Sequence, residues 1–433
     1  MPDFHQASEP PFASIAGFLT GPRLARACAA LLALEIAVFL FLIAGTHGWI
    51  VPLERATTTD FASFYAAGKL AAAGTPALAY DQAAHHAMEQ AVTAPGIEYQ
   101  FFNYPPVYLL LCAVLAQLPY LAAFVLFIAA TFAFYLAVAR RILGDRSPAA
   151  IVVLLSFPMV FWTMGLGQNA FLTAALFGLA TVLLESRPIA AGILFGLLCY
   201  KPHFGVLVPI ALAAGGYWRS FLAAGCSAAA LVLISLALFG WETWQAFFVT
   251  AGAAHAVYES GRILFAGFAN PFGAVRLLGG PVALAYAVQG LASLAAAALV
   301  LIVWRYRLSL PLRAAGLAAA SLVAAPVAIF YDLMLGTIAV CWLMRDESPA
   351  LTPAEKTFFV AITVLRGNHR VAARCPPSRR KLASAGRGHR NARPVCDRDR
   401  PRLPRARAAR PRLELVAETL RRLTNHPCWG VSP

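Results

Sequence analysis

Three side chains that follow the first apolar stretch of the sequence have types and spacing suited to chemistry. Asp60 is followed by Tyr65 and Lys69, which lie one helical turn apart within Thr57–Gly74. A carboxylate at a membrane surface could act as a general base, and a lysine beside it could contact a phosphate. Asp60 could also simply cap a helix, and Lys69 could reach the membrane surface without any partner. Both alternatives stay open.

The residues after Asp60 predict a helix that holds this carboxylate at the mouth of a membrane-embedded bundle. Phe61, Phe64, Tyr65 and Gly68 recur at three- and four-residue intervals. This spacing gives one apolar face, which can lie on a membrane. The helix is expected to start at Thr59 or Asp60.

Two further motifs place polar side chains between apolar runs. The stretch NYPPVY, residues 103–108, contains Tyr104 and is either an aromatic anchor at the membrane interface or part of a site. The stretch GLGQNAF, residues 165–171, contains Gln168 and Asn169. Side-chain amides at a helix junction could bind sugar hydroxyls, or they could hold helices together.

Ionisable residues appear at two places deep within apolar sequence. Lys201 and His203 flank Pro202, with about a dozen apolar residues on either side. If Lys201 lies inside the bundle, it could neutralise a phosphate as negative charge develops on a leaving group. The alternative is a short loop at the membrane interface.

A late hairpin contributes Tyr331 and Asp332, and Asp332 is the only acidic residue between Glu259 and Asp346. An unpaired carboxylate in lipid is costly, so Asp332 should face a cavity or pair with a cation. Arg262 is a candidate partner for it, or a second phosphate contact.

Three ionisable residues follow one another at helical spacing in the polar segment after Asp60. Asp81, His85 and Glu89 stand at i, i+4 and i+8. One long helix face spreads three ligands too far for tight metal binding, so a solvated helix face is the favoured interpretation. No metal and no other cofactor is expected.

The composition indicates a protein that crosses a membrane several times. Of its 433 residues, 60% are hydrophobic and only 13% are charged, whereas soluble domains carry about 25% charged residues. Apolar segments fill most of residues 27–365, which leaves no room for a soluble nucleotide-binding domain.

The formal charge of +15 comes almost entirely from the end of the chain. Residues 366–433 contain 18 Lys or Arg and 4 Asp or Glu, a balance of +14, which leaves +1 for residues 1–365. This Arg- and Pro-rich composition cannot span a membrane or form a core. It is typical of a disordered basic tail or of an out-of-frame translation of a GC-rich gene, and we assign it no catalytic role and no nucleic-acid partner.

The apolar segments predict an all-α polytopic membrane protein with roughly 10–12 transmembrane helices around a cavity. The first span is expected near residues 28–49, and two short spans should flank a turn at Leu118–Tyr120. Later apolar segments lie near residues 149–165, 168–184, 188–200, 202–216, 219–240, 281–304, 311–329 and 331–344. Several are shorter than the roughly 20 residues that a straight span needs.

Charge placement predicts the orientation of the chain and its boundaries. Arg23 and Arg26 precede the first span, which favours a cytoplasmic N-terminus over residues 1–26. Residues 50–103 would then form a long first extracytoplasmic loop, with helix breaks at Gly74–Pro76 and Pro95–Gly96. A second outer loop is expected at Trp241–Phe265. The membrane domain is expected to cover residues 27–365.

The motifs, in their order, resemble glycosyltransferase family 87, a polyprenyl-phosphate-dependent, mannosyltransferase-like group with the GT-C fold. The resemblance covers roughly residues 55–345. It is carried by TDFASFYAAGKLAAAGTPALAYD, YPPVY, GLGQNAFL and AGILFGLLCYKPHFGVLVPI.

This resemblance implies an integral-membrane hexosyltransferase whose active site faces away from the cytoplasm of a bacterial cell, in its inner membrane. The donor would be a polyprenyl-phosphate sugar, with mannose as the hexose, and the acceptor a glycolipid or glycan. Family members carry an aspartate in the first outer loop as the catalytic base, and Asp60 stands at that position. The reaction would invert the anomeric centre. The substrate-binding candidates are Tyr65, Lys69, Tyr104, Gln168, Asn169, Lys201, His203, Arg262, Tyr331 and Asp332.

Two other classes of function remain open on the sequence. A transporter or lipid-linked sugar flippase would explain broken helices and buried charge equally well, but it explains the long acidic first loop less well. A non-enzymatic assembly subunit would be favoured only if Asp60 were dispensable.

Overall fold

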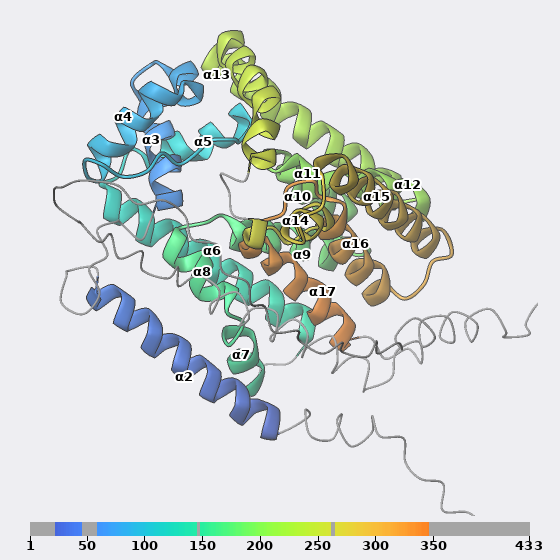
Figure 1. Ribbon diagram of the computed structural model, residues 1–433. Coiled ribbons are helices and arrows are strands. Elements are labelled where there is room, and N and C mark those ends of the chain that lie inside the picture. The colour runs from blue at the N-terminus through green and yellow to red at the C-terminus, as the bar shows by residue number, and fades with distance from the viewer. Residues whose placement is uncertain (1–21, 46–58, 145–147, 261–264, 346–433) are drawn as a thin grey trace, which may run out of the picture. The chain divides into compact units, whose positions relative to one another are not determined.

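The computed structural model describes residues 22–45, 59–144, 148–260 and 265–345, and this part of the chain is helical throughout (Figure 1). It contains one isolated bridge, between Phe268 and Ile329, and no strand. The α-helices are α2 Pro22–Gly45, α3 Thr59–Ala72, α4 Gln82–Val92, α5 Pro106–Leu115, α6 Tyr120–Leu143, α7 Pro148–Leu155, α8 Met159–Leu166, α9 Ala170–Leu183, α10 Pro188–Leu197, α11 Pro202–Gly205, α12 Val208–Gly215, α13 Trp218–Glu259, α14 Pro271–Leu277, α15 Val282–Arg305, α16 Leu310–Ala324 and α17 Met334–Arg345.

Short 3-10 helices join several of these elements. They are η1 Pro76–Tyr80, η2 Leu198–Tyr200, η3 Phe265–Gly267 and η4 Phe330–Leu333. Two of them, η2 and η4, interrupt the apolar sequence at Lys201 and at Asp332. The predicted tail, residues 366–433, lies outside the described residues.

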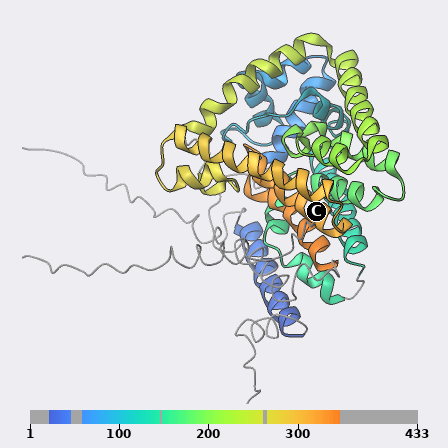
Figure 2. The same cartoon turned by 90° about the vertical axis from the view of Figure 1, so that its right-hand side faces the viewer.

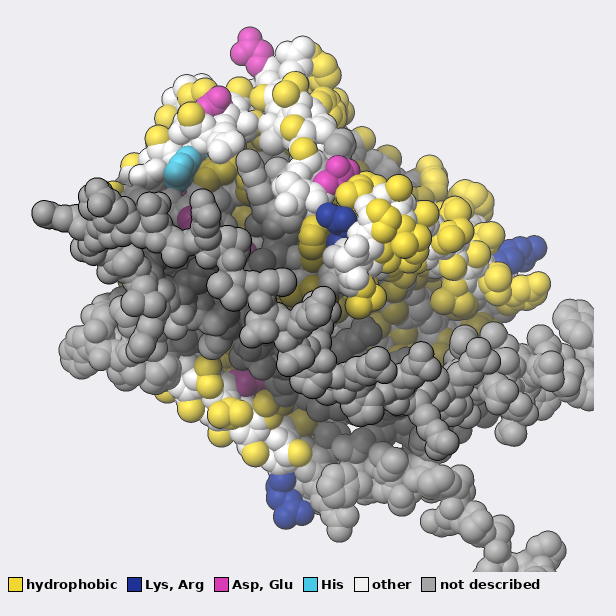
Figure 3. Space-filling model, in the orientation of Figure 1, with side chains coloured by type: hydrophobic (Ala, Val, Ile, Leu, Met, Phe, Trp, Pro, Cys, Tyr) yellow, Lys and Arg dark blue, Asp and Glu magenta, His cyan; other side chains and the backbone are white. Residues whose placement is uncertain are grey.

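Length and hydropathy identify a multi-pass membrane protein. Within the described ranges, three helices are long and apolar enough to cross a membrane: Tyr120–Leu143, Trp218–Ala253 and Val282–Arg305. Five apolar helices of 10–17 residues accompany them. Their outward surface is mainly hydrophobic, and charged side chains occupy only a few places on it (Figure 3). The predicted fold class is confirmed, whereas the predicted number of spans stays a prediction.

The segment after α2 folds into a compact helical unit. Helix α3 packs against α4, η1 and α5 (Figure 1). The chain turns at Gly74 and Gly96, which both have φ of 80°, so the two predicted helix breaks are confirmed. Asp81 caps α4, since its Oδ1 accepts a hydrogen bond from the Ala84 N–H at 2.8 Å.

Helix α13 differs from its prediction, because the interval expected to form a second outer loop is helical as far as Glu259. Gly240, with φ of 76° and ψ of 167°, kinks the helix, and this bend divides the two halves in Figure 2. A positive φ is accessible to glycine at little cost. The second half of α13 packs against η1, where Thr250 Oγ1 donates to the Tyr80 carbonyl at 3.2 Å.

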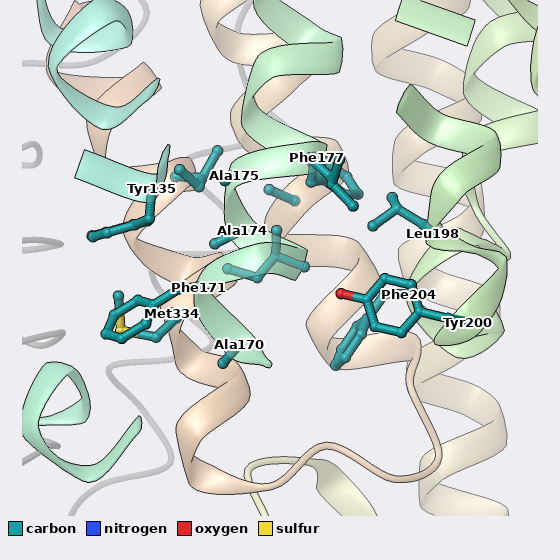
Figure 4. Packing of buried hydrophobic residues seen from close by; sticks show 14 of the residues in the cluster. Tyr135, Ala170, Phe171, Ala174, Ala175, Phe177, Leu198, Tyr200, Phe204 and Met334 are labelled. Carbon is teal, nitrogen blue, oxygen red and sulfur yellow. The ribbon is translucent and has the colours of Figure 1, made fainter. Parts of the chain in front are cut away.

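Helix α9 is mostly buried and forms the centre of the hydrophobic core. Its buried residues Phe171 and Phe177 lie between Tyr135 and Met334 on one side and Leu198, Tyr200 and Phe204 on the other (Figure 4). Hydroxyl groups on both sides of α9 are paired, Tyr200 with Thr173 at 2.7 Å and Tyr135 with Thr337 at 2.8 Å. A helix that is buried over most of its surface is held in a fixed position, and the N-terminal end of α9 belongs to the site.

Candidate active site

Asp60 lies in the first turn of α3, so the helix starts at the earlier of the two predicted positions. Phe61 and Phe64, which follow it, are fully buried. They anchor this turn against aromatic rings of the neighbouring helices, including Phe124 at 5.3 Å between ring centroids and Tyr104 at 5.2 Å. Asp60 itself remains partly exposed. The helix N-terminus also carries a partial positive charge, which stabilises a carboxylate there.

Gln168 holds the Asp60 carboxylate from the junction between α8 and α9. Its Nε2 donates to Asp60 Oδ2 at 3.0 Å. The junction can approach α3 because Gly167 has no side chain: a Cβ there would collide with Phe61, and its φ of 71° also favours glycine. Gln168 is buried and Asp60 is partly exposed, so the hydrogen bond lies at the boundary between the protein interior and its surface.

Lys201 and Asp332 form a buried ion pair at a second point of the site. The Lys201 ammonium lies 2.8 Å from Asp332 Oδ1, and each side chain is 5% exposed. The other carboxylate oxygen of Asp332 accepts a hydrogen bond from the Ile329 N–H at 3.0 Å, which fixes η4. The expectation that Asp332 pairs with a cation is confirmed, but the cation is Lys201.

Aromatic rings surround the Lys201 ammonium. Its Nζ lies 5.4 Å from the centre of the Tyr331 ring, 5.7 Å from that of Phe204 and 5.9 Å from that of Tyr104. The faces of these rings attract a cation. A buried ammonium with one carboxylate and several rings around it is therefore stabilised without water.

Tyr104 connects the two parts of the site. Its hydroxyl donates to Gln168 Oε1 at 3.4 Å, and its ring faces Lys201. The chain Asp60–Gln168–Tyr104–Lys201–Asp332, which we call the site network, thus brings together five segments of sequence. Without substrate it holds two carboxylates and one ammonium.

The remaining candidate residues take different positions. Asn169 is fully buried beside Gln168, and its side-chain amide faces the hydroxyls of Tyr104 and Tyr108. His203 lies in α11 with its ring against Phe204, 4.3 Å between centroids, within electrostatic reach of Lys201 and Asp332. Arg262 lies outside the described residues.

Tyr65 and Lys69 point to the turn between α5 and α6. The Tyr65 hydroxyl donates to the Leu118 carbonyl at 2.7 Å, and the Lys69 ammonium lies 5.3 Å from the centre of the Tyr65 ring. These contacts join the two residues to the α5–α6 turn and to each other. Their role in binding substrate stays a prediction.

Some residues near the site have surroundings that the sequence did not indicate. Tyr108 is buried inside the protein, stacked on Tyr200 at 5.2 Å, and so is not an anchor at a membrane interface. His85 and Glu89 are both fully buried, so the predicted solvated face of α4 is wrong for these two residues. The repeated tyrosines of the stretch 103–108 could have indicated the aromatic stack.

Metal-ligating side chains do not gather in the described part of the chain, where no group of three His, Cys, Asp or Glu could hold an ion. The five described cysteines are free thiols, all in apolar helices or in η2. Positive charge in the site network is therefore supplied by Lys201.

Comparison with known proteins identifies the family. No curated protein and no solved structure gave a significant match. The sequence model of glycosyltransferase family 87 matches residues 101–330, a region that holds Tyr104, Gln168 and Lys201 and begins after Asp60. Since this match covers more than half of the 433 residues, the protein belongs to glycosyltransferase family 87.

Proposed function

We propose that this membrane glycosyltransferase moves a hexose, mannose, from a polyprenyl-phosphate donor to a hydroxyl of a glycolipid or glycan, with inversion and with Asp60 as general base. One observation carries the proposal. The site network joins a carboxylate at the start of a helix to a buried ammonium, through an amide and a phenol. Transfer from a phosphate needs a base at one end and a cation at the other.

The chemistry follows from these two groups. The acceptor oxygen attacks the anomeric carbon and loses its proton to the Asp60 carboxylate. The bond between the anomeric carbon and the phosphate oxygen breaks, and its electron pair leaves with the polyprenyl phosphate. The leaving group already carries negative charge, so it needs a cation rather than an acid, and Lys201 supplies that cation.

Before substrate binds, Gln168 would orient Asp60, and Asp332 would balance the charge of Lys201. The hydrogen bond from Gln168 orients the Asp60 carboxylate toward the acceptor. Asp332 neutralises Lys201 at rest, and the phosphate then shares or replaces this carboxylate. Buried amides such as Asn169 would receive sugar hydroxyls.

The side of the membrane follows from the donor. Nucleotide sugars are confined to the cytoplasm, whereas a polyprenyl-phosphate sugar can be presented on the other face. Arg23 and Arg26 in the first turns of α2, and Arg140 and Arg141 at the end of α6, favour a cytoplasmic position for those ends. The first outer loop, with Asp60, would then be extracytoplasmic, in a bacterial inner membrane.

The test is transfer of radiolabelled mannose from polyprenyl-phosphate mannose to a lipid extract of the source organism, in detergent. Asp60→Asn should abolish the product while the amount of folded protein is unchanged. Asp81→Asn is the matched control: it changes an exposed carboxylate of the same loop and keeps the helix cap. Equal labelling by wild type and Asp60→Asn would overturn the proposal.

A lipid-linked sugar flippase is the second candidate, favoured by the helices interrupted at Lys201 and Asp332. Movement of donor across sealed vesicles, without a glycosidic product in detergent, would favour it.

A further inference from the structure

Outside the site network, His85 and Glu89 form a buried pair in the first outer loop. Both side chains are 0% exposed, and His85 Nδ1 lies 3.6 Å from Glu89 Oε1. They stand one turn apart on α4, which packs against α3. Two ionisable groups buried in this way are costly unless they share charge or protons.

The hydrogen bonds around the pair fix the proton on one ring nitrogen. His85 Nε2 lies 3.1 Å from the Ser63 carbonyl oxygen, which can only accept, so Nε2 carries a proton. Glu89 Oε2 accepts a hydrogen bond from the Gln100 N–H at 3.2 Å. His85 Nδ1 and Glu89 Oε1, which have no other partner among the described residues, therefore face each other.

These facing atoms require one proton between them. With no proton, two lone pairs would be buried against each other; with two, a cation and a neutral acid would both present hydrogens. Burial lowers the pKa of His85 to about 4 and raises that of Glu89 to about 8. Both pKa shifts favour a neutral pair, in which Glu89 carries the proton and His85 is uncharged.

The other ionisable groups around the pair come from three elements. His86 on α4 lowers the pKa of His85 further. Tyr99, after α4, lies edge-on to the His85 ring at 5.7 Å between centroids, and burial raises its pKa to about 12, so it stays neutral. Asp81, at the start of α4, acts on Tyr99. From α3, the charge of Asp60 acts on Glu89 and raises its pKa.

The link to Asp60 is both mechanical and electrostatic. The carbonyl that His85 holds belongs to Ser63, three residues after Asp60 on α3. Because interaction between two charges is mutual, a charge on Glu89 acts on Asp60 as Asp60 acts on Glu89.

We propose that the buried His85–Glu89 pair is a positioning and charge-setting element for Asp60. It keeps one proton beneath the first turns of α3 at neutral pH, and it gives that proton to solvent at alkaline pH. The carboxylate left behind makes Asp60 a stronger base. The proposal rests on the proposed role of Asp60.

The consequence is an alkaline rise in turnover that depends on Glu89. A buried negative charge nearby raises the pKa of a carboxyl group, by about one unit in ordinary cases. If a rise of one unit in the pKa of Asp60 raises the logarithm of the rate of proton removal by about half a unit, turnover rises roughly threefold. Glu89→Gln keeps the shape and cannot ionise, so it should lack this rise.

The experiment compares kcat at about pH 7 and pH 9 for wild type, Glu89→Gln and Asp81→Asn, with polyprenyl-phosphate mannose and the lipid extract. We expect the ratio of the two rates to be roughly threefold higher in wild type and Asp81→Asn than in Glu89→Gln. Identical ratios in all three would overturn the proposal. Asp60→Asn separates the two ideas: if it is active, the proposed function fails, whereas an inactive Asp60→Asn with identical ratios removes only the role of the pair.

A second measurement needs no substrate. Infrared spectroscopy of the purified protein detects the carbonyl stretch of a protonated carboxyl group. We expect a band at neutral pH that weakens in alkaline buffer and that is weaker in Glu89→Gln than in wild type. If Glu89→Gln does not fold, His85→Asn replaces it, and the band should then shift. A wild-type spectrum with no protonated carboxyl band at neutral pH would overturn the proposal.

Discussion

The Lys201 ammonium and the Asp332 carboxylate lie 2.8 Å apart although 131 residues separate them in the sequence. Each is surrounded by protein, and the carboxylate is held by the Ile329 N–H as well. Neither charge would be stable at its position without the other, since an unpaired buried charge is strongly unfavourable. The pair therefore ties η4 to the junction of η2 and α11.

Removing one member of this pair should destabilise the protein more than removing both. Lys201→Met leaves Asp332 buried and unpaired, and we expect a loss of about 3–5 kcal/mol in the free energy of unfolding. The double variant Lys201→Met/Asp332→Asn should recover most of it and still show no transfer, because the phosphate has lost its cation. Thermal unfolding in detergent and transfer assays check both.

The control for this prediction is the pair of Arg313 and Glu185, 2.9 Å apart, in which Glu185 is 54% exposed. Arg313 is buried but also donates to the Tyr217 hydroxyl at 2.8 Å, so Glu185→Gln should cost less than Lys201→Met. A double variant no more stable than Lys201→Met would show that the buried pair is not the cause.

Gln168→Leu should lower turnover without unfolding the protein. It removes the hydrogen bond to the Asp60 carboxylate, and a bond to a charged group contributes about 1.5–3 kcal/mol. We expect kcat to fall by about 10- to 100-fold. The control is Gln117→Leu, because exposed Gln117 bonds only to the Ala113 carbonyl of its own helix. Similar kcat values for the two variants would count against Gln168 as the residue that orients Asp60.

Tyr104→Phe and Tyr65→Phe should affect different properties. Tyr104→Phe keeps the ring beside Lys201 but loses the hydroxyl that contacts Gln168, so kcat should fall by about threefold, as expected for a long, neutral hydrogen bond. Tyr65→Phe loses the bond to Leu118 and should cost about 1 kcal/mol of stability with kcat unchanged. A larger loss of transfer in Tyr65→Phe would return Tyr65 to the substrate-binding residues.

Gly167→Ala should separate Gln168 from Asp60. The new Cβ would collide with Phe61 in a backbone conformation that alanine rarely adopts, so both stability and kcat should fall. Gly225→Ala and Gly290→Ala are the controls, since they lie in helices with open space around them. Alanine favours a helix over glycine by about 1 kcal/mol. Equal melting temperatures for all three variants would contradict this prediction.

The melting temperature should depend on pH through Glu89. Its pKa is raised on folding from 4.5 to about 8, so the folded state binds the extra proton, and stability falls as pH rises through this window. His85 has a lowered pKa, from 6.5 to about 4, which adds stability as pH rises through its own window. The two effects oppose each other up to about pH 6.5, and above it the fall due to Glu89 continues without the opposing gain from His85.

The measurement is therefore melting temperature between about pH 6.5 and 8, for wild type and Glu89→Gln. Wild type should lose more stability across this range than Glu89→Gln does. A parallel decline in both proteins would assign it to another group.

The sequence predicted most helices and most of the site network, because burying a polar residue in an apolar segment is energetically unfavourable. Gln168, Lys201 and Asp332 were each singled out for that reason, and they lie in or beside one network with Asp60. Sequence alone could not pair Lys201 with Asp332. The energetic cost of burying a charged residue predicts that it has a partner but does not identify that partner. Arg262 was an equally reasonable choice.

His85 and Glu89 show why local pattern fails for part of the site. A histidine and a glutamate one turn apart are typical of an exposed helix face. Their burial depends on the Ser63 carbonyl and the Gln100 N–H, which come from elements elsewhere in the chain. The helical end of α13 was missed for a related reason: the polar interval Trp241–Phe265 suggested a loop, but the helix resumes after the kink at Gly240 and continues to Glu259.

The kinked helix α13 also dictates an order of assembly. Tyr80, in the loop that contains Asp60, receives its hydrogen bond from Thr250, 170 residues later, and its ring packs on Phe247. During synthesis the loop is translated long before α13, and it waits with part of its apolar surface uncovered until the second half of α13 arrives. The segment that carries the proposed base is thus among the first to be made and among the last to be completed.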